Sequence, residues 1–422
     1  MNVRIIEGIK GGTVKAIPSK SMAHRLMIAA ALSKDNPQVV CQSESEDILA
    51  TRRVLEELLS NGDRAELDCG ESGSTLRFIL PIAGVLGKKC LFTGRGRLPE
   101  RPSTPLCEEM IRHGCNISNG GRVNFNLSGK LTGGIFKLPG NVSSQFFTGL
   151  LMALPLAEED SIIRVEGKLE SSPYVEMTLE VLKMSGIIIK RTTSGFAIPG
   201  KQSYDLKGTV EVEGDWSNAA FWLSMGAIGC GSVAGGLKSD FTKICVKGLN
   251  TASKQGDMEI IEILRRMGAR IEINECGSQT SVEVYPSVLE ATEIDGADIP
   301  DLVPIISVVA AAATGYTRIY NCKRLKLKES DRLKAIETVL RALGADVTAN
   351  DDGLDIRGGK SLKGGSVDSF ADHRIAMMAA SAANICQNPV LIERAQAVNK
   401  SYPGFFSDFR LLGGKIDSEE DR

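Results

Sequence analysis

Apolar and polar positions recur along the chain in a pattern that predicts helices followed by strands. Six amphipathic segments with helical spacing each end in a glycine and precede residues typical of strands. Glycine suits the left-handed position just beyond a helix end, so we expect helices that stop at Gly62, Gly114, Gly186, Gly268, Gly344 and Gly413. Strands with alternating polarity are predicted at 269–273, 281–285 and 353–358.

A second set of six segments interleaves with the first and is apolar on nearly every side. A helix of this kind belongs in a core rather than at a surface. These segments are 17–33, 72–87, 143–157, 215–229, 299–315 and 372–384. The repeating unit therefore holds one buried helix, one amphipathic helix and several strands, and six units fit two globular halves of three units each.

The two chain ends predict how the halves are connected. Little chain follows the last amphipathic segment, whereas the N-terminal residues have strand character and no helix of their own. We therefore expect the N-terminal segment to complete the last unit. One domain would then contain residues 1–17 and 214–422, with residues 18–213 inserted, and 422 residues are indeed too many for a single core.

Composition narrows the class of protein. The net charge of −2 gives no basic field of the kind that nucleic-acid binding needs. The ten cysteines form no C-x-x-C pair, which argues against a structural zinc site, and scattered thiols fit a reducing cytoplasm, although a disulfide stays open. The most apolar stretch, 303–315, falls short of the roughly 20 residues that span a bilayer. We expect a cytoplasmic protein without membrane or nucleic-acid partners.

Polar residues gather where each buried helix is expected to begin. For any one of these places an ordinary N-cap is the simplest interpretation, because Ser, Asp and Asn accept bonds from free backbone N–H groups. Cations oppose the helix dipole there, so capping does not explain Lys20, Arg25, Arg77 or Arg374. A bound phosphate or carboxylate would explain them, and several such helix starts together would form an anion site.

Three further segments carry charge without an evident packing role. They are an arginine-rich Gly/Pro loop at 94–106, a charged helix start at 325–339 and the segment 397–406 around Lys400. Each has an ordinary surface explanation when taken alone: a solvated basic loop, a charge-paired helix start and a solvent-facing lysine.

Nine short motifs occur in an order that matches one family. They are SKSMAHR, SGSTLR, LPERP, SSQF, SSPY, IPD, KESDR, DHR and NKSYP. With these motifs, essentially the whole chain resembles the 5-enolpyruvylshikimate-3-phosphate synthase family of enolpyruvyl transferases. The resemblance implies an α/β (α+β) fold of two similar domains, each of three βαβαββ repeats in an inside-out α/β barrel, with the active site in the interdomain cleft.

The resemblance also implies a reaction. The enolpyruvyl group of phosphoenolpyruvate moves to the 5-hydroxyl of 3-phosphoshikimate through a tetrahedral addition–elimination intermediate, and phosphate is released on the route to chorismate and aromatic amino acids. No metal and no cofactor are implied, the substrates are small molecules, and a monomer is expected. Such chemistry needs acid/base groups together with cations that hold several anionic groups.

The family's roles fall on matching positions of this sequence. The implied catalytic residues are Asp301, Glu329 and Lys20. The implied 3-phosphoshikimate ligands are Lys20, Ser21, Arg25, Ser143, Ser144, Gln145, Ser171, Tyr174, Asp301 and Lys328. The implied phosphoenolpyruvate ligands are Lys20, Gly73, Arg101, Gln145, Arg332, Arg374 and Lys400. Which group carries each proton stays open, with Lys20 and Glu329 in competition.

Two alternatives remain beside this interpretation. UDP-N-acetylglucosamine enolpyruvyltransferases typically have Lys-Asn where this chain has Lys20-Ser21, and a cysteine-bearing loop where 94–102 has no cysteine. Both differences favour shikimate chemistry. A non-catalytic anion-binding homologue is disfavoured by Asp301 and Glu329, because phosphate binding alone needs no acids.

Overall fold

The computed structural model describes residues 1–35, 37–121, 124–229, 242–276 and 279–418. The chain divides into two compact units, each with its own hydrophobic core. We call Met1–Ser19 with Glu213–Arg422 the terminal unit, and Lys20–Val212 the inserted unit. The sequence had placed these boundaries after residue 17 and before residue 214.

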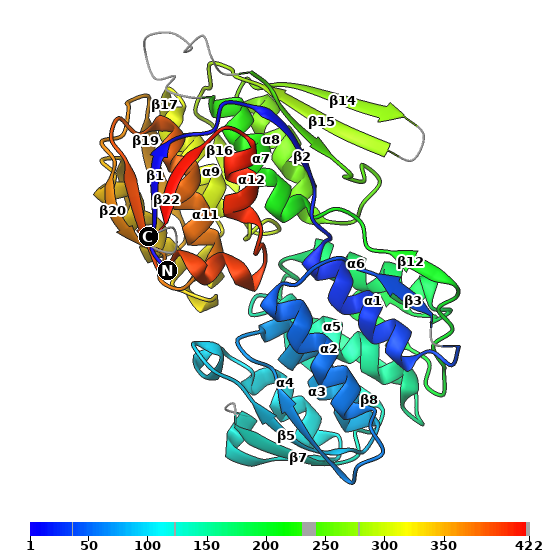
Figure 1. Ribbon diagram of the computed structural model, residues 1–422. Coiled ribbons are helices and arrows are strands. Elements are labelled where there is room, and N and C mark those ends of the chain that lie inside the picture. Colours follow the sequence, from blue (N-terminus) through cyan, green and yellow to red (C-terminus); the bar gives the residue numbers. More distant parts are fainter. Residues whose placement is uncertain (36, 122–123, 230–241, 277–278, 419–422) are drawn as a thin grey trace. The chain divides into compact units, whose positions relative to one another are not determined.

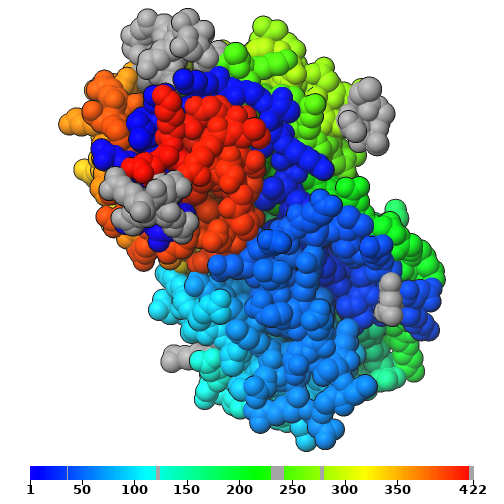
Figure 2. All heavy atoms as spheres, in the orientation of Figure 1, coloured from blue at the N-terminus to red at the C-terminus, as the bar shows by residue number. Residues whose placement is uncertain are grey.

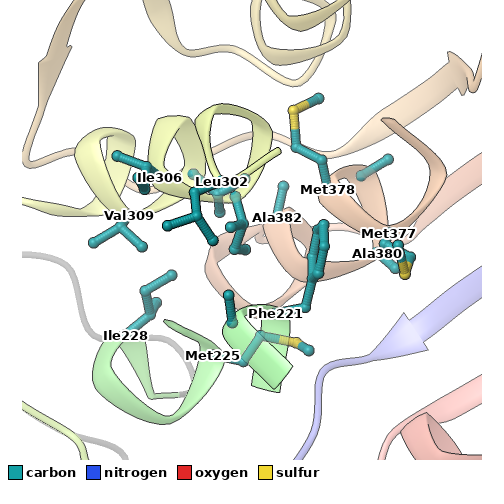
Figure 3. Close-up of a cluster of buried hydrophobic side chains, with 14 of the residues drawn as sticks. Phe221, Met225, Ile228, Leu302, Ile306, Val309, Met377, Met378, Ala380 and Ala382 are labelled. Atoms are coloured by element: carbon teal, nitrogen blue, oxygen red, sulfur yellow. The ribbon is translucent and has the colours of Figure 1, made fainter. Parts of the chain in front are cut away.

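Three buried helices form the centre of the terminal unit. They are α7 (Trp216–Ile228), α9 (Val303–Ala312) and α11 (His373–Ala382). Figure 3 shows apolar side chains from the three helices gathered in one cluster, among them Phe221 and Met225 of α7, Ile306 and Val309 of α9, and Met377 of α11. These helices are apolar on nearly all sides because neighbouring helices and sheets surround them.

Three sheets and three further helices enclose that centre. In every sheet one parallel pair of strands continues into antiparallel pairs, and most strands bury alternate residues. The sheets are, in spatial order, β14 (Arg270–Cys276), β15 (Gln279–Tyr285), β13 (Ile244–Lys247) and β2 (Gly12–Lys15); β16 (Glu293–Asp295), β17 (Gly315–Tyr320), β19 (Leu354–Gly358) and β18 (Asp346–Ala349); β20 (Gly365–Asp368), β21 (Val390–Glu393), β1 (Val3–Glu7) and β22 (Lys415–Ser418). The amphipathic helices are α8 (Ile260–Arg266), α10 (Arg332–Ala342) and α12 (Phe405–Leu411).

The N-terminal segment completes the last of these sheets. Strand β1 lies between β21 and β22, and Val3 pairs with Ile392 on one side and with Ser418 on the other. Figure 1 shows β1 beside β22, and the space-filling view shows blue N-terminal and red C-terminal segments side by side on the terminal unit (Figure 2). The expectation that the N-terminus completes the last repeat is confirmed.

The inserted unit repeats the design with one shortened repeat. Its buried helices are α1 (Lys20–Leu32), α3 (Gly73–Val85) and α5 (Ser144–Ala153), and its amphipathic helices are α2 (Glu46–Leu58), α4 (Thr104–Arg112) and α6 (Ser172–Met184). Two sheets have four strands: β4 (Arg64–Asp68), β5 (Lys89–Thr93), β7 (Phe125–Gly129) and β6 (Cys115–Ile117); β10 (Lys190–Thr192), β11 (Gly195–Ile198), β9 (Ser161–Glu166) and β8 (Gly134–Pro139). The repeat of α1 and α2 has only β12 (Thr209–Glu211) paired with β3 (Gln38–Val40) in the described residues, because α2 leads almost directly into β4.

Five of the six predicted helix-stopping glycines lie where expected. Gly114, Gly186, Gly268, Gly344 and Gly413 each have a positive φ two residues beyond a helix end. The prediction for Gly62 is wrong, because Gly62 is not among the positive-φ glycines. Helix α2 already ends at Leu58, so the chain has left the helix before it reaches Gly62.

Short 3-10 helices connect the repeats. They are η1 (Leu98–Glu100), η2 (Ser118–Gly121), η3 (Leu154–Leu156), η4 (Gly256–Glu259), η5 (Lys323–Leu327), η6 (Ala383–Ile385) and η7 (Ala395–Lys400). Within the described ranges, every helix is too short or too polar to cross a bilayer. Cys230 lies outside the described residues, and Cys41, Cys69, Cys90, Cys107, Cys115, Cys245, Cys322 and Cys386 are free thiols.

Candidate active site

Charged residues converge around one buried arginine in the terminal unit, a group that we call the Arg332 cluster. Arg332 is the first residue of α10 and is only 1% exposed. Asp301 stands just before α9, and Asp372 caps the N-terminus of α11. The residues of the cluster therefore come from the starts of three helices, α9, α10 and α11.

The Arg332 guanidinium bonds three carboxylates at once. Its Nη1 donates to Asp301 Oδ1 at 2.7 Å, its Nη2 to Glu329 Oε2 at 2.8 Å and its Nε to Asp372 Oδ2 at 2.8 Å. Arg374 Nη2 donates to the other oxygen of Asp301 at 3.3 Å. Asp301 and Glu329, both predicted to be catalytic, are thus held on one planar cation.

The cations around Asp301 control its charge. Burial alone would raise the pKa of Asp301, but Arg374, Lys328 and Arg332 outweigh that effect and hold the pKa well below its ordinary value. Lys328 Nζ lies 4.0 Å from Asp301 Oδ1. Burial lowers the pKa of Lys328 to about 8, although Asp301 opposes that change. Near neutral pH Asp301 is therefore an anion and Lys328 is a cation close to its titration.

Lys400 joins the cluster through a turn in an uncommon backbone conformation. Its Nζ donates to the carbonyl of Ala371 at 2.7 Å, and Ala371 directly precedes Asp372. Phe370 and Ala371 both have left-handed φ angles, 54° and 52°, which non-glycine residues rarely adopt. The turn directs Asp372 to Arg332, while the second oxygen of Asp372 caps the backbone N–H of Arg374 at 2.9 Å.

A second buried arginine, Arg25 of α1, lies in the inserted unit and, among the described residues, has only neutral hydrogen-bond partners. Its guanidinium donates to the hydroxyls of Thr178 at 2.9 Å and Thr148 at 3.3 Å, and to the carbonyls of Tyr174 at 2.8 Å and Ser21 at 2.5 Å. All four acceptors are neutral. Burial lowers the pKa of Arg25 to about 9, which is the signature of a cation held out of water.

The start of α3 gathers a further set of predicted residues. Gln145 accepts from Arg77 Nη1 at 2.7 Å and donates to the hydroxyl of Ser74 at 2.9 Å. A Cβ atom at Gly73 would lie 2.6 Å from Arg77 Nη1 and 2.7 Å from Arg101 Nη1. Only glycine therefore leaves both guanidinium groups in place beside the helix N-terminus.

The remaining predicted residues of the inserted unit also lie at helix starts. Lys20 is the first residue of α1, and its Nζ pairs with Asp47 Oδ2 at 2.8 Å. Ser143 caps α5, which begins at Ser144. Ser171 precedes α6 with a left-handed φ of 53° and is 2% exposed.

Three acids in or next to these clusters were not predicted as site residues. Asp372 is the first residue of the predicted core segment 372–384, where an N-cap was the simplest interpretation, and Asp47, the partner of Lys20, was not singled out. Asp257 is 2% exposed and accepts a hydrogen bond from Ser217 at the start of α7. Its sequence signal, an acid in the first turn of an amphipathic helix, is shared by ordinary surface helices.

No set of three or more His, Cys, Asp or Glu side chains suited to a metal ion occurs within the described part of the chain. The arrangement combines anionic acids, a lysine near its titration and several cations at helix starts. It is suited to binding anions and to moving protons beside them.

The comparisons with known proteins agree on one family. The model of "EPSP synthase (3-phosphoshikimate 1-carboxyvinyltransferase)" matches residues 5–409. The chain is 41% identical to the 3-phosphoshikimate 1-carboxyvinyltransferase of Clostridium perfringens, over 97% of each chain, and 41% identical to that of Clostridium kluyveri, over 96% of each.

Solved structures share the fold at lower sequence identity. The EPSP synthase of Acinetobacter baumannii matches with a TM-score of 0.78 and 22% identity, covering 99% of this chain and 100% of that one. The enolpyruvyl transferase NikO of Streptomyces tendae matches with a TM-score of 0.74 and 17% identity, over 99% and 98%. The fold is the two-domain inside-out α/β barrel of these proteins.

Proposed function

The chain belongs to the EPSP synthase family, and from that premise we propose how its own residues carry out the reaction. It is a 3-phosphoshikimate 1-carboxyvinyltransferase: the 5-hydroxyl oxygen of 3-phosphoshikimate forms a bond to C2 of phosphoenolpyruvate, and C3 gains a proton. The C2–phosphate bond of the tetrahedral adduct then breaks as C3 loses a proton. Two proton transfers in opposite directions therefore need groups that both give and accept protons.

The observation that carries the proposal is the bonding of Asp301 and Glu329 to the same buried guanidinium. In this proposal Asp301 accepts the proton of the 5-hydroxyl. Arginines hold its pKa low without substrate, which makes it a weak base. A phosphoenolpyruvate anion that takes over bonds of Arg332 and Arg374 would offset their charge, raise the pKa of Asp301 and strengthen it as a base.

Glu329 is proposed to give a proton to C3 and to take it back, with Lys20 as the competing group. Both lie at helix starts, Glu329 beside α10 and Lys20 on α1. Each is already paired, Glu329 with Arg332 and Lys20 with Asp47. Glu329→Gln and Lys20→Met distinguish the two. Only the substitution that removes the proton-transfer group should abolish exchange of the C3 hydrogens with solvent in the presence of both substrates.

The other residues are proposed to hold the anionic groups. 3-Phosphoshikimate is assigned to Ser21, Arg25, Ser143, Ser144, Gln145, Ser171, Tyr174 and Lys328, with the three later serines largely at its phosphate. Phosphoenolpyruvate is assigned to the backbone at Gly73 and to Arg101, Gln145, Arg332, Arg374 and Lys400. The hydrogen bonds of Arg25, Arg332 and Lys400 support the assignment, because protein oxygens occupy N–H donors that a substrate carboxylate or phosphate would use.

The experiment is a phosphate-release assay with the purified chain. Release should require phosphoenolpyruvate and 3-phosphoshikimate together, and either substrate alone should give none. Release with UDP-N-acetylglucosamine in place of 3-phosphoshikimate would overturn the assignment. Binding of both substrates without any release would instead support a non-catalytic anion-binding protein.

We further propose that the chain acts as a monomer in the cytoplasm, without a nucleic-acid partner. Its free buried thiols suit a reducing compartment, and its net charge of −2 gives nucleic acid no basic surface field. Light scattering of the active enzyme at assay concentration should give the mass of one chain, 45.2 kDa. A mass of two or more chains would contradict the monomer.

A further inference from the structure

Asp257 is a buried carboxylate that has no assigned role and is connected to the Arg332 cluster through one residue, Ser217. Asp257 is on η4, which packs against α7, and it is 2% exposed. Its neighbour Gln255 fixes that position: the amide oxygen accepts from the backbone N–H of Trp216 at 3.0 Å, and the amide nitrogen donates to the carbonyl of Gly214 at 2.8 Å. Asp257 is therefore held rigidly against the first turn of α7.

One residue connects Asp257 to the proposed phosphoenolpyruvate ligands. The Ser217 hydroxyl donates to Asp257 Oδ2, while the Ser217 carbonyl accepts from Arg374 Nη1 at 3.2 Å. The other nitrogen of that guanidinium, Nη2, donates to Asp301 at 3.3 Å. Arg374 therefore bridges Asp301, directly, and Asp257, through Ser217.

A structural anchor at this place would not need a charge. The hydroxyl of Ser217 requires only an acceptor, which an amide supplies, and burying a carboxylate costs free energy unless a cation offsets it. The charged groups that act on Asp257 are Asp301 beside α9, Arg374 on α11 and Asp215 at the cap of α7. Burial, with Asp301 next, raises the pKa of Asp257 to about 7, so its charge changes within the working range of an enzyme.

We propose that Asp257 is a positioning residue that orients Arg374 through Ser217 and whose negative charge weakens the hold of Arg374 on phosphoenolpyruvate. The inference rests on the proposed function, which assigns that anion to Arg374. When Asp257 is ionised, two carboxylates share the charge of Arg374, and a substrate anion meets a less positive site. When Asp257 is protonated, only Asp301 competes, and the anion binds more tightly.

The test is the KM for phosphoenolpyruvate at saturating 3-phosphoshikimate, from about pH 6 to about pH 9, in the wild type and in Asp257→Asn. The substrate's own titration is the same for both, so the ratio of the two KM values isolates Asp257. We expect this ratio, wild type over variant, to rise on the order of fivefold across the range, with kcat changing less. A constant ratio with an active wild type would overturn the inference.

Two further variants keep the test decisive. Ser217→Ala removes a hydrogen bond that lowers the pKa of Asp257, so the rise in KM should move to higher pH. Glu337→Gln is the matched control, because Glu337 is a buried carboxylate of the same unit that bonds Lys334 and Ala349 instead. A control that alters the profile as Asp257→Asn does would overturn the inference. A wild type that releases no phosphate would overturn the proposed function, and this inference with it.

Discussion

Two buried arginines, one in each unit, show how differently the same side chain is used. Arg25 and Arg332 are 2% and 1% exposed, and both lie at or near helix starts. The bonds of Arg25 go to hydroxyls and carbonyls, whereas those of Arg332 go to three carboxylates. Arg25 therefore has neutral bonding partners, as the proposed role in binding an anion would need, whereas Arg332 uses its charge to hold three acids in place.

The pKa values of the two arginines shift in opposite directions for the same reason. Burial lowers the pKa of Arg25 to about 9. Burial acts on Arg332 as well, but Asp372, Glu329 and Asp301 more than offset it and raise its pKa. A cation that is costly to bury without a ligand gains most from binding an anion, which supports the assignment of Arg25 to 3-phosphoshikimate.

The largest expected effect comes from removing Arg332, the arginine that bonds three carboxylates. Arg332→Met leaves Asp301, Glu329 and the fully buried Asp372 without their shared partner. We expect the free energy of unfolding at neutral pH to fall by about 4 kcal/mol, the usual scale for breaking a buried ion pair. Urea unfolding followed by circular dichroism measures it. A loss below about 1 kcal/mol would show that the carboxylates do not depend on Arg332.

Replacing the acid held by Arg332 should have its largest effect on the rate of the reaction. Asp301→Asn keeps an oxygen acceptor for Arg332 but cannot take a proton, so kcat should fall at least about a hundredfold while both substrates still bind. Phosphate release gives kcat and calorimetry gives binding. Glu337→Gln serves again as the control, and near-full activity of Asp301→Asn would remove Asp301 from the mechanism.

The arginine with neutral partners should show the opposite balance of effects. Arg25→Met should weaken 3-phosphoshikimate binding about thirtyfold, because a charge-assisted contact is lost. Stability should change by only about 1 kcal/mol, since the hydroxyls of Thr148 and Thr178 still bond each other at 2.9 Å. Calorimetry and urea unfolding of the same preparation test both. A stability loss equal to that of Arg332→Met would abolish the contrast between the units.

The repeats could be predicted from sequence because their signals are local. A helix that is apolar all round must be a core helix, and each of the six predicted core segments contains one. The shortened first repeat was not foreseen, although the short run between Leu58 and Arg64 leaves no room for two further strands. Gly62 was misassigned because the end of α2 depends on packing, which propensity alone does not determine.

Lys20, Arg25, Arg77 and Arg374 could be singled out from the sequence, because a cation at the start of an apolar helix is anomalous. Arg332, Lys328 and Lys400, and the acids Asp301 and Glu329, were assigned to the site only through the family resemblance.

The other partners of these cations could not be predicted. Asp372 lies 40 residues from Arg332, and Asp257 lies 40 residues from Ser217. Such pairs exist only once the repeats have stacked their helix starts together. An acid at a helix start also looks ordinary, because it suits the helix dipole.

The smallest expected effect is on the pH dependence of the free energy of unfolding, where Asp257 and Asp301 of the same unit should act in opposite directions. The folded-state pKa of Asp257, about 7, lies above its ordinary value of 3.8, so the folded chain binds the proton more tightly than the unfolded chain. The contribution of Asp257 to stability therefore falls as pH rises from about 4 to about 7. Asp301, whose pKa is lowered, contributes stability that is lost as pH falls below about 4.

Asp257→Asn removes the pH dependence of stability that is due to Asp257 and leaves the one that is due to Asp301. The free energy of unfolding of the variant, minus that of the wild type, should increase by about 1 kcal/mol or more between about pH 4 and about pH 8. Urea unfolding at a series of pH values measures the difference, and Glu337→Gln should show no such increase. A difference that stays constant with pH would mean that Asp257 keeps its ordinary pKa in the folded chain. It would then be fully ionised beside Arg374 throughout the working range, and the KM for phosphoenolpyruvate could not depend on its titration.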